Sequence, residues 1–338
     1  MTQLTYRRNE LLSEHDYAAP HVVAGRRMHG GMSSDGTYQP PRSLGRVAAL
    51  DAWTHALRVS GGELFDAHAS LLDGDRTPTV EQSRILLRYG LGETFWNSLT
   101  ITGKIEARGR LLADFAFPDL QPSIVDDISE MAIGHLNRGL LYAHGIDEGG
   151  QPDIGIGGHN EMWFAARDLA FGPGAYPDVD PPENIARPEA GRRFMPEVSP
   201  AVEGLLSLLM NLLIIEFRAE IGFAATQAVL RTPDLFADRR AEAELAAEIV
   251  GRIRTDEEIH VSSLQLYLGE LCTVQFRTVS GGEITGAELI NRFWGGLVTW
   301  ATTEQPRQLS QAQRVLIEER IRLAADPERI LAAFSAAA

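Results

Sequence analysis

A long helical pattern from about Arg239 to about Thr273 limits the fold more than any other part of the sequence. Within it, Glu257 and His260 are three residues apart, so on an α-helix both side chains leave the same face and can reach one ion. A Glu-x-x-His pair is half of what a dinuclear carboxylate centre takes from a four-helix bundle. The alternative is an exposed charged face, so three further helices with inward-facing acids are needed to support a metal site.

The overall charge excludes some classes of partner. The 338 residues carry a net charge of −15, with 44% hydrophobic and 23% charged residues, which is typical of a globular protein. An acidic chain disfavours nucleic acid and anionic membranes as partners, because phosphate binding needs a basic surface. The single cysteine, Cys272, excludes a disulfide framework. Together with an N-terminus that lacks an apolar signal core, this predicts a cytoplasmic protein.

Strand patterns are scarce, and the sequence predicts an all-α fold. Residues 1–44 are polar, contain glycine and proline breakers, and are predicted to form an irregular N-terminal arm. Residues 45–338 are predicted to form a single helical domain. It would begin with helices at Leu44–Val59 and Gly62–Leu72 and end with C-terminal helices within about residues 285–336, at 285–302, 310–325 and 327–336.

The first helix of the predicted bundle starts at Thr79, where Thr79-x-x-Gln82 fits a capping box, and continues to about Leu112. Glu93 lies between apolar neighbours in this helix and is a candidate metal ligand. Glu106 stands close to Arg108 and Arg110, which favours a solvated charged face for that acid.

The second predicted helix runs from Pro122 to Gly145 and contains Glu130 and His135 among its apolar positions. In an ideal α-helix these two side chains point about 140° apart and would not share an ion. A π-bulge beside Gly134 would align them, and such bulges occur often at functional sites. Glu130 is therefore a candidate ligand, and His135 could join it only if the helix is irregular.

Residues 145–200 are rich in glycine and proline and predict a long lid-like excursion with one short helix at Asn160–Leu169. His159 and Glu161 could approach a metal from this lid, although a purely structural role is the simpler interpretation of each.

The third bundle helix is predicted at Ala201–Leu230 and is apolar nearly all round, as a central helix should be. Glu216 comes at the end of its apolar run, and Glu220 follows one turn later. A carboxylate buried there needs a cation or an ion pair. Either a metal or Arg218 could satisfy Glu216.

Glu93, Glu130, Glu216 and the Glu257-x-x-His260 pair thus fall on four successive predicted helices. Over about residues 79–273 this pattern resembles the ferritin-like superfamily of dinuclear metal-carboxylate proteins. Asp256-Glu257-Glu258-Ile259-His260 is similar to the last ligand motif of acyl-carrier-protein desaturases and of N-oxygenases that convert arylamines to nitro compounds. The chain departs from the family at Ile133, where the histidine following Glu130 is expected; His135, His159 or Glu161 would have to replace it.

The resemblance implies a four-helix bundle holding two iron or manganese ions, with Glu130 and Glu257 as bridges and Glu93 and Glu216 as terminal ligands. His260 and His135 would each complete one ion. The implied activity is oxygenation of a small organic substrate (N-oxygenation, hydroxylation or desaturation) with O2 and an external electron donor. A ferroxidase-like metal-handling protein and a metal-free helical scaffold or binding protein, whose acids pair with arginines, remain alternatives. The C-terminal helices offer a surface for a homodimer.

Overall fold

The computed structural model describes residues 3–72, 74, 76–183, 185–188 and 191–337. This part of the chain is 62% helix and 7% strand, in agreement with the predicted all-α class. The outermost residues of the predicted arm and C-terminal region, residues 1–2 and 338, and residues 184 and 189–190 of the predicted lid lie outside the described ranges.

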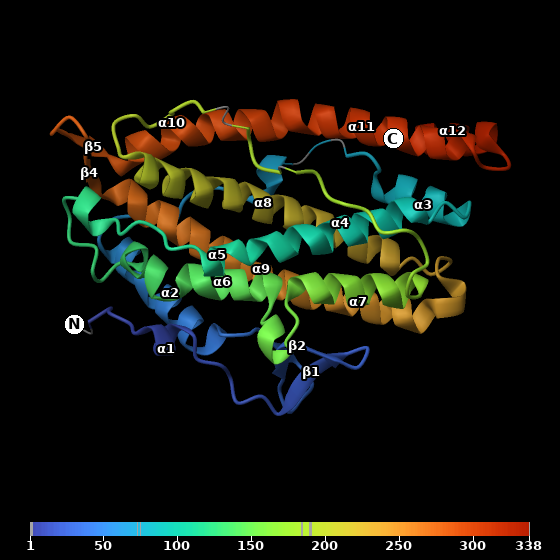
Figure 1. Cartoon of the computed structure of the whole chain (residues 1–338), viewed down its shortest axis with the longest axis horizontal. Helices are drawn as coiled ribbons and strands as arrows, with labels where there is room; N and C mark the ends of the chain where they lie inside the picture. The colour runs from blue at the N-terminus through green and yellow to red at the C-terminus, as the bar shows by residue number, and fades with distance from the viewer. Residues whose placement is uncertain (1–2, 73, 75, 184, 189–190, 338) are drawn as a thin grey trace.

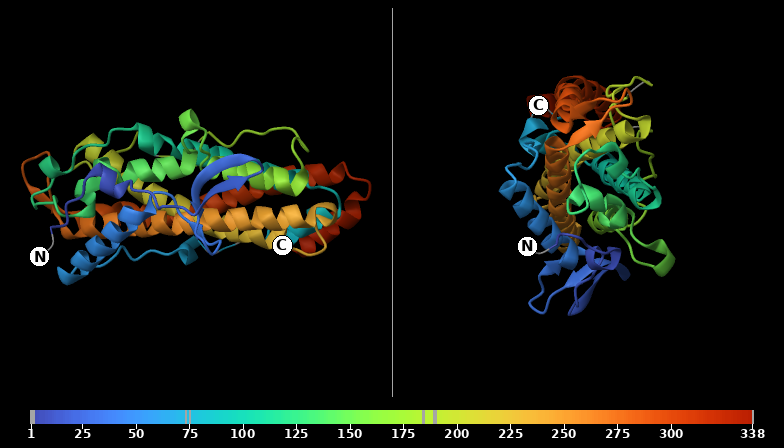
Figure 2. Two further views of the ribbon diagram at one scale, coloured as in Figure 1. Left: turned by 90° about the horizontal axis from the view of Figure 1, so that it is seen from below. Right: turned by 90° about the vertical axis from the view of Figure 1, so that its left-hand side faces the viewer.

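Long helices run side by side along the longest axis of the molecule (Figure 1). Helix α8 (Pro200–Leu230) packs against α9 (Arg240–Thr273). Helix α4 (Glu93–Gly109) packs against both α6 (Leu140–Gly149) and α7 (His159–Phe171), and α7 also packs against α9. Because α6 and α7 follow one another along one line (Figures 1 and 2), they form a single interrupted row. The bundle therefore consists of α4, the α6–α7 row, α8 and α9.

The interruption between α6 and α7 is built from glycines at close backbone contacts. Gly150 has a φ of +70°, which ends α6 in a conformation that favours glycine. A Cβ on Gly158 would stand 2.3 Å from the Gly150 nitrogen and 2.7 Å from the Asp147 and Glu148 oxygens. The connection of residues 150–158, which includes η4 (Pro152–Ile154), therefore leaves the row and returns to it at almost the same point.

The prediction of a lid over residues 145–200 is wrong for its first half. Residues 145–149 end α6, and the predicted short helix is confirmed as α7, which belongs to the bundle. Beyond the connection of residues 150–158, the described residues between Phe171 and Pro200 contain no helix or strand. This stretch lies along α4, where the Arg108 guanidinium donates to the Pro182 carbonyl at 2.7 Å and Lys104 pairs with Asp178 at 2.7 Å.

The capping box at Thr79 is confirmed, but the helix it starts is shorter than predicted. Helix α3 (Val80–Arg88) ends before Gly90, whose φ is +75°. The chain resumes as α4 and then α5 (Leu111–Asp114). The predicted helix at Gly62–Leu72 is also wrong, since only a single 3-10 turn, η1 (Ala69–Leu72), forms there.

The predicted helix from Pro122 to Gly145 is wrong over most of its length. The chain forms η2 (Gln121–Ser123), turns, and the 3-10 helix η3 (Ala132–Arg138). Side-chain oxygens compete with helix formation here: Asp127 accepts from the Ser129 amide at 2.9 Å, and Asp126 accepts from the Gln275 amide at 2.8 Å. Most of the apolar residues are still buried, with Val125 exposed, so burial in the core produced the helix-like pattern.

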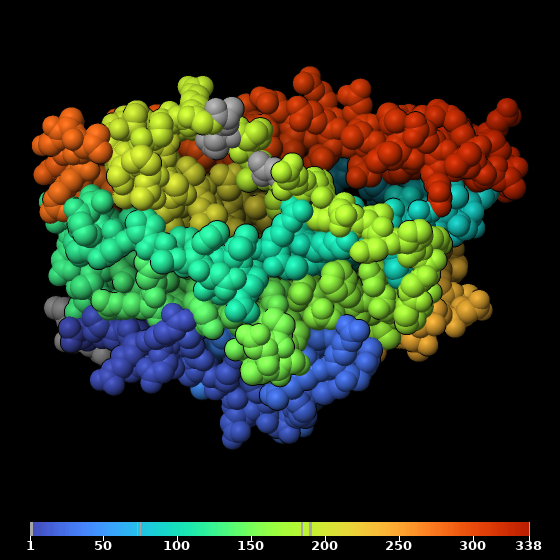
Figure 3. Space-filling model, viewed as in Figure 1, coloured from blue at the N-terminus to red at the C-terminus, as the bar shows by residue number. Residues whose placement is uncertain are grey.

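The N-terminal residues are ordered rather than irregular. After α1 (Arg8–Leu11), the strands β1 (Ala19–Val23), β2 (Arg26–Met32) and β3 (Tyr38–Gln39) form an antiparallel sheet, followed by α2 (Ser43–Val59). Strand β2 is tied to the helix interruption, because the His29 amide donates to the Gly157 carbonyl at 2.8 Å. In the space-filling view the blue N-terminal residues lie directly beneath the green α6–α7 row (Figure 3).

The C-terminal residues add a layer on the other side of the bundle (Figure 1). The hairpin of β4 (Gln275–Arg277) and β5 (Glu283–Thr285) leads into α10 (Gly286–Thr299), which packs on α8 and α9. A π-helical turn, η6 (Trp300–Glu304), joins α10 to α11 (Gln305–Arg322), and α12 (Pro327–Ala336) packs on α3. The predicted terminal helix at 327–336 is confirmed.

Helix α8 is the central apolar helix that the sequence predicts. Within the described ranges it is also the one helix whose length and composition would suffice to cross a membrane, and 56% of its apolar stretch is buried inside the protein. A core helix gives the same signal, and α8 carries the buried carboxylates of Glu203 and Glu216. The apolar run therefore reflects a core position.

Candidate metal centre

Two groups of buried donor atoms meet in the middle of the bundle, and a third group, His29, His159 and Asp256, adjoins them through His159. The first group contains His144, Glu148, Glu216 and His260, and the second contains Glu106, Glu148, His159 and Glu257. In each group one donor atom from every residue lies within 4.8 Å of the others, and Glu148 belongs to both groups. Each group could hold a metal ion, and the carboxylate of Glu148 connects the two.

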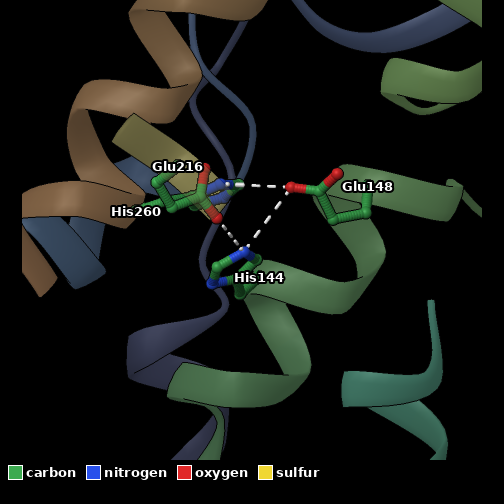
Figure 4. A group of neighbouring side chains, drawn as sticks. All are labelled: His144, Glu148, Glu216 and His260. Atoms are coloured by element: carbon green, nitrogen blue, oxygen red, sulfur yellow. Dashed lines mark ion pairs between the residues drawn. The ribbon is translucent and has the colours of Figure 1, made fainter. Parts of the chain in front are cut away.

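The first group brings together α6, α8 and α9 (Figure 4). Nε2 of His144 lies 3.0 Å from Oε1 of Glu216 and 3.5 Å from Oε1 of Glu148. Nδ1 of His260 lies 3.3 Å from the same Glu148 oxygen. The two imidazoles stack with their centroids 3.7 Å apart, so the nitrogens point toward the carboxylates from one side.

The second group centres on His159, the first residue of α7. Its Nδ1 lies 3.1 Å from Oε1 of Glu257, 3.5 Å from Oε2 of Glu106 and 3.6 Å from Oε1 of Glu148. The other oxygen of Glu257, Oε2, lies 2.7 Å from Nδ1 of His260. Glu257 therefore faces both groups, one oxygen to each, as a second bridging carboxylate would.

Glycine at position 109 makes room for the shared acid. A Cβ on Gly109, at the end of α4, would stand 2.5 Å from Cγ of Glu148. Glu148 itself is near the end of α6, and His159 begins α7. The interruption of the row thus brings the Glu148 carboxylate and the His159 imidazole to the same point, although the connection of residues 150–158 lies between them in the chain.

Burial and the close contacts between the donors shift the pKa values of the whole cluster. Burial, followed by the neighbouring carboxylates, raises the pKa of Glu106 well above its ordinary value and that of Glu216 to about 7. Burial alone would lower the pKa of His159 and of His260, but the carboxylates around them raise both well above the usual range. The same imidazoles outweigh the effect of burial and lower the pKa of Glu148 and of Glu257.

The donor set is chemically suited to divalent cations. Four buried carboxylates carry four negative charges, which two such ions would balance. Oε2 of Glu106 and Nδ1 of His159 are fully enclosed yet have no hydrogen-bond partner, as expected of atoms that face an ion. A mixture of carboxylates and imidazoles suits iron or manganese.

Four of the residues singled out in the sequence are brought together in this centre. Glu216, Glu257 and His260 come from the predicted third and fourth bundle helices. His159, for which a structural role was the simpler interpretation, is fully buried. Its ring lies between the carboxylates of Glu257 and Asp256. Arg218, the predicted alternative partner of Glu216, instead lies over the ring of Trp300.

The candidates on the first and second predicted helices lie elsewhere. Glu93 is the first residue of α4 and forms an ion pair with Arg320 on α11. Glu130 is exposed in a turn. His135 is buried, but its Nε2 accepts from the Tyr6 amide at 3.1 Å and its Nδ1 pairs with the Met131 carbonyl at 2.9 Å. The proposed π-bulge is wrong, since η3 is a 3-10 helix.

The two remaining candidates point outward. Glu161 lies at the surface in an ion pair with Arg26, their atoms 2.6 Å apart. Glu220 is exposed on α8, one turn beyond Glu216. Neither shares a donor group with the centre.

Sequence reasoning missed Glu106, His144 and Glu148. The assignment of Glu106 to a solvated face is wrong, because only 8% of the residue is exposed. His144 and Glu148 are four residues apart, a spacing that places both on one helical face. They escaped notice because the predicted second helix ended at Gly145, whereas α6 continues to Gly149.

The chain matches no known protein-family model, and neither a curated protein nor a solved structure shows significant similarity to it. What can be said about function therefore rests on the chemistry of the centre itself.

Proposed function

We propose that the protein is an O2-activating oxygenase that uses two iron or manganese ions and oxidises a small organic substrate. The observation that carries this proposal is the sharing of Glu148 between two buried donor groups that mix imidazole and carboxylate. The packing of α4, the α6–α7 row, α8 and α9 around these donors supports a ferritin-like bundle, in keeping with the family that the sequence resembles.

The residues divide naturally between the two ions. His144, Glu216 and His260 would hold one ion, Glu106 and His159 the other, and Glu148 and Glu257 would bridge them. When bound, the metal pair supplies the electrons and the open coordination positions that the reduction of dioxygen requires. The bundle contributes a dry surrounding, because the neighbours Leu213 and Phe217 of Glu216 are themselves buried and limit access of water.

A metal-free scaffold is less well supported. Its acids would pair with arginines, as Glu93 does with Arg320. Among the described residues, Glu106, Glu148, Glu216 and Glu257 instead form their ion pairs with histidines. Histidine is the most common metal ligand in proteins, whereas arginine is not one.

A ferroxidase is the second candidate, because it would use the same donors. Two surface cavities, of about 360 Å³ and about 330 Å³, are lined by residues such as Phe171 and Tyr176 or Cys272 and Trp294, and none of the donors lines either one. An oxygenase must therefore admit its substrate by another route or by movement of the chain, whereas a ferroxidase needs to admit only iron and O2.

Metal content per chain, measured after expression with iron supplied, tests the centre. We expect about two ions in the parent protein, in line with dinuclear bundles, and loss of both in Glu148→Ala because it removes the shared ligand. Glu220→Ala, which changes an exposed acid on α8, is the matched control and should keep both ions. Absence of metal from the parent would overturn the proposal.

Oxygen uptake then separates the two candidates. The reduced, iron-loaded protein is mixed with O2 and a panel of arylamines, fatty acyl thioesters and aromatic acids. Uptake that depends on one of these compounds, with formation of its oxidised product, supports the oxygenase. Uptake that depends only on added Fe²⁺ supports the ferroxidase.

A further inference from the structure

The buried carboxylate of Asp256 gathers three side chains. Its Oδ2 lies 3.2 Å from Nε2 of His159 and 3.1 Å from Nε2 of His29, and it accepts from the Tyr38 hydroxyl at 2.8 Å. Only 1% of Asp256 is exposed. His29 belongs to β2 and Tyr38 to β3, so the N-terminal sheet holds the carboxylate that holds His159.

Asp147 contacts the imidazole of His260 in the same way as Asp256 contacts that of His159. Its Oδ2 lies 3.1 Å from Nε2 of His260 and accepts from Nη2 of Arg46 at 2.8 Å. Its Oδ1 accepts from Nη2 of Arg42 at 2.5 Å and from Nε of the same side chain at 3.1 Å. The two arginines counter the effect of burial and hold the pKa of Asp147 well below its usual range. Both arginines come from the N-terminal region, at the start of α2.

The two aspartates therefore form a matched pair. Each directly precedes a bridging glutamate, Glu148 or Glu257, and each contacts an imidazole donor carried by another helix. An aspartate that accepts a hydrogen bond from Nε2 fixes the proton on that nitrogen and leaves Nδ1 free to bind metal. Nδ1 is the atom that faces the carboxylates in both His159 and His260.

We propose that the N-terminal segment of residues 29–46 is a working part of the metal centre and not only a cover over the bundle. Tyr38 and His29, acting through Asp256, position His159. Arg42 and Arg46, acting through Asp147, position His260. This inference rests on the proposed metal site. Its consequence is that each half of the segment controls one of the two ions.

Cobalt(II) binding to the full-length, metal-free protein tests this division, with affinity measured by calorimetry and ligand geometry by visible absorption. Tyr38→Phe and Asp256→Asn should weaken one of the two sites about 10- to 100-fold, as changes to groups that support metal ligands do. The other site should keep its affinity. Arg46→Gln and Asp147→Asn should weaken the opposite site and leave the first unchanged.

Ser33→Ala is the matched control, since it also removes one hydroxyl from residues 29–46, and the Ser33 hydroxyl donates to the Thr37 carbonyl at 3.0 Å on the exposed side of that segment. It should bind both ions as the parent does, with an unchanged absorption spectrum. Tyr38→Phe removes a single oxygen atom, so it provides a test even if an aspartate variant does not fold.

The outcomes are distinguishable. If the parent binds two cobalt ions and Tyr38→Phe and Asp256→Asn bind both with parental affinity, the positioning role is overturned and the metal site stands. Equal weakening of both sites in every variant would show a general loss of structure and would also overturn it. A parent that binds no cobalt would overturn the metal site together with this inference.

Discussion

Nδ1 of His159 lies 3.6 Å from Oε1 of Glu148, although the connection of residues 150–158 separates them in the chain. An interrupted helix row thus does what a continuous Glu-x-x-His segment does elsewhere: it places a carboxylate and an imidazole one above the other on the inner face of a bundle. This relationship explains why the second predicted helix lacked a matching motif.

The close approach of the end of α6 to the start of α7 depends on Gly158. Its substitution by alanine would place a methyl group within contact distance of the Gly150 nitrogen and the last carbonyls of α6. We expect Gly158→Ala to destabilise the protein by roughly 1–3 kcal/mol, as overpacking does, and to lower the metal content by moving His159 away from Glu148. Thermal unfolding and metal analysis measure the two effects.

Gly222→Ala is the control for that change. Gly222 lies within α8, where an added Cβ meets nothing within 4 Å. It should bind metal normally and gain up to about 1 kcal/mol from helix propensity. If Gly158→Ala were equally harmless, the close approach of α6 and α7 would have no role in the centre.

The acids that the sequence favoured on the first two helices should be dispensable. We expect Glu93→Gln and Glu130→Gln to retain full metal content, because Glu93 faces Arg320 and Glu130 is exposed. In contrast, Glu106→Gln should lose at least one ion. Parallel metal analysis of the three variants is sufficient, and loss of metal from Glu93→Gln would contradict the ligand set described above.

Metal should stabilise the folded chain strongly. Four buried carboxylates lie close together in the folded chain, so metal ions would bind the folded state and not the dispersed donors of the unfolded chain. At a free metal concentration about 1,000 times the dissociation constant, each site contributes roughly 4 kcal/mol. Removal by a chelator should therefore lower the Tm of the parent, and leave the Tm of Glu148→Ala unchanged.

A buried acid outside the centre gives a prediction about pH. Burial raises the pKa of Glu270 from 4.5 to about 7, although the Ala132 and Ile133 amides donate to its carboxylate. Between these two values the unfolded chain binds fewer protons than the folded one, so the free energy of unfolding falls as pH rises through this window. The loss amounts to roughly 3 kcal/mol between pH 4.5 and 7.

The comparison with Glu270→Gln isolates this effect, because other groups of the metal-free protein titrate in the same range. The free energy of unfolding, measured in urea at several pH values, should fall less steeply with pH in the variant. The difference in slope should correspond to about one bound proton. Identical pH profiles would mean that Glu270 does not titrate in this window.

The helices that carry a long periodic pattern were predictable from the sequence. Helices α8 and α9, and with them Glu216, Glu257 and His260, appear where the apolar period places them. The region around Glu130 was not, because buried apolar residues there imitate a helical period while Asp126 and Asp127 bond to backbone amides.

The donors that could not be predicted from the sequence were hidden for a different physical reason. His144, Glu148 and His159 lie beside the interruption of the α6–α7 row. Contacts between Gly150 and Gly158, at the two ends of the connection, bring the two halves of the row together. Such contacts leave no periodic trace in a sequence. Glu106 was assigned to a solvent-exposed face because arginines lie near it in the sequence. In the structure Glu106 is buried, and Arg108 points away from it and donates to the carbonyl of Pro182.

The order of the donors along the chain has a consequence for biosynthesis. Glu106 is made first and His260 last, so a growing chain lacks part of the ligand set until α9 has left the ribosome. In the proposed metalloprotein, incorporation of metal would therefore follow the synthesis of α9. Until then, the apoprotein has to keep its acids buried in the protonated or histidine-paired form, and the supply of metal would govern how much of the newly made protein matures.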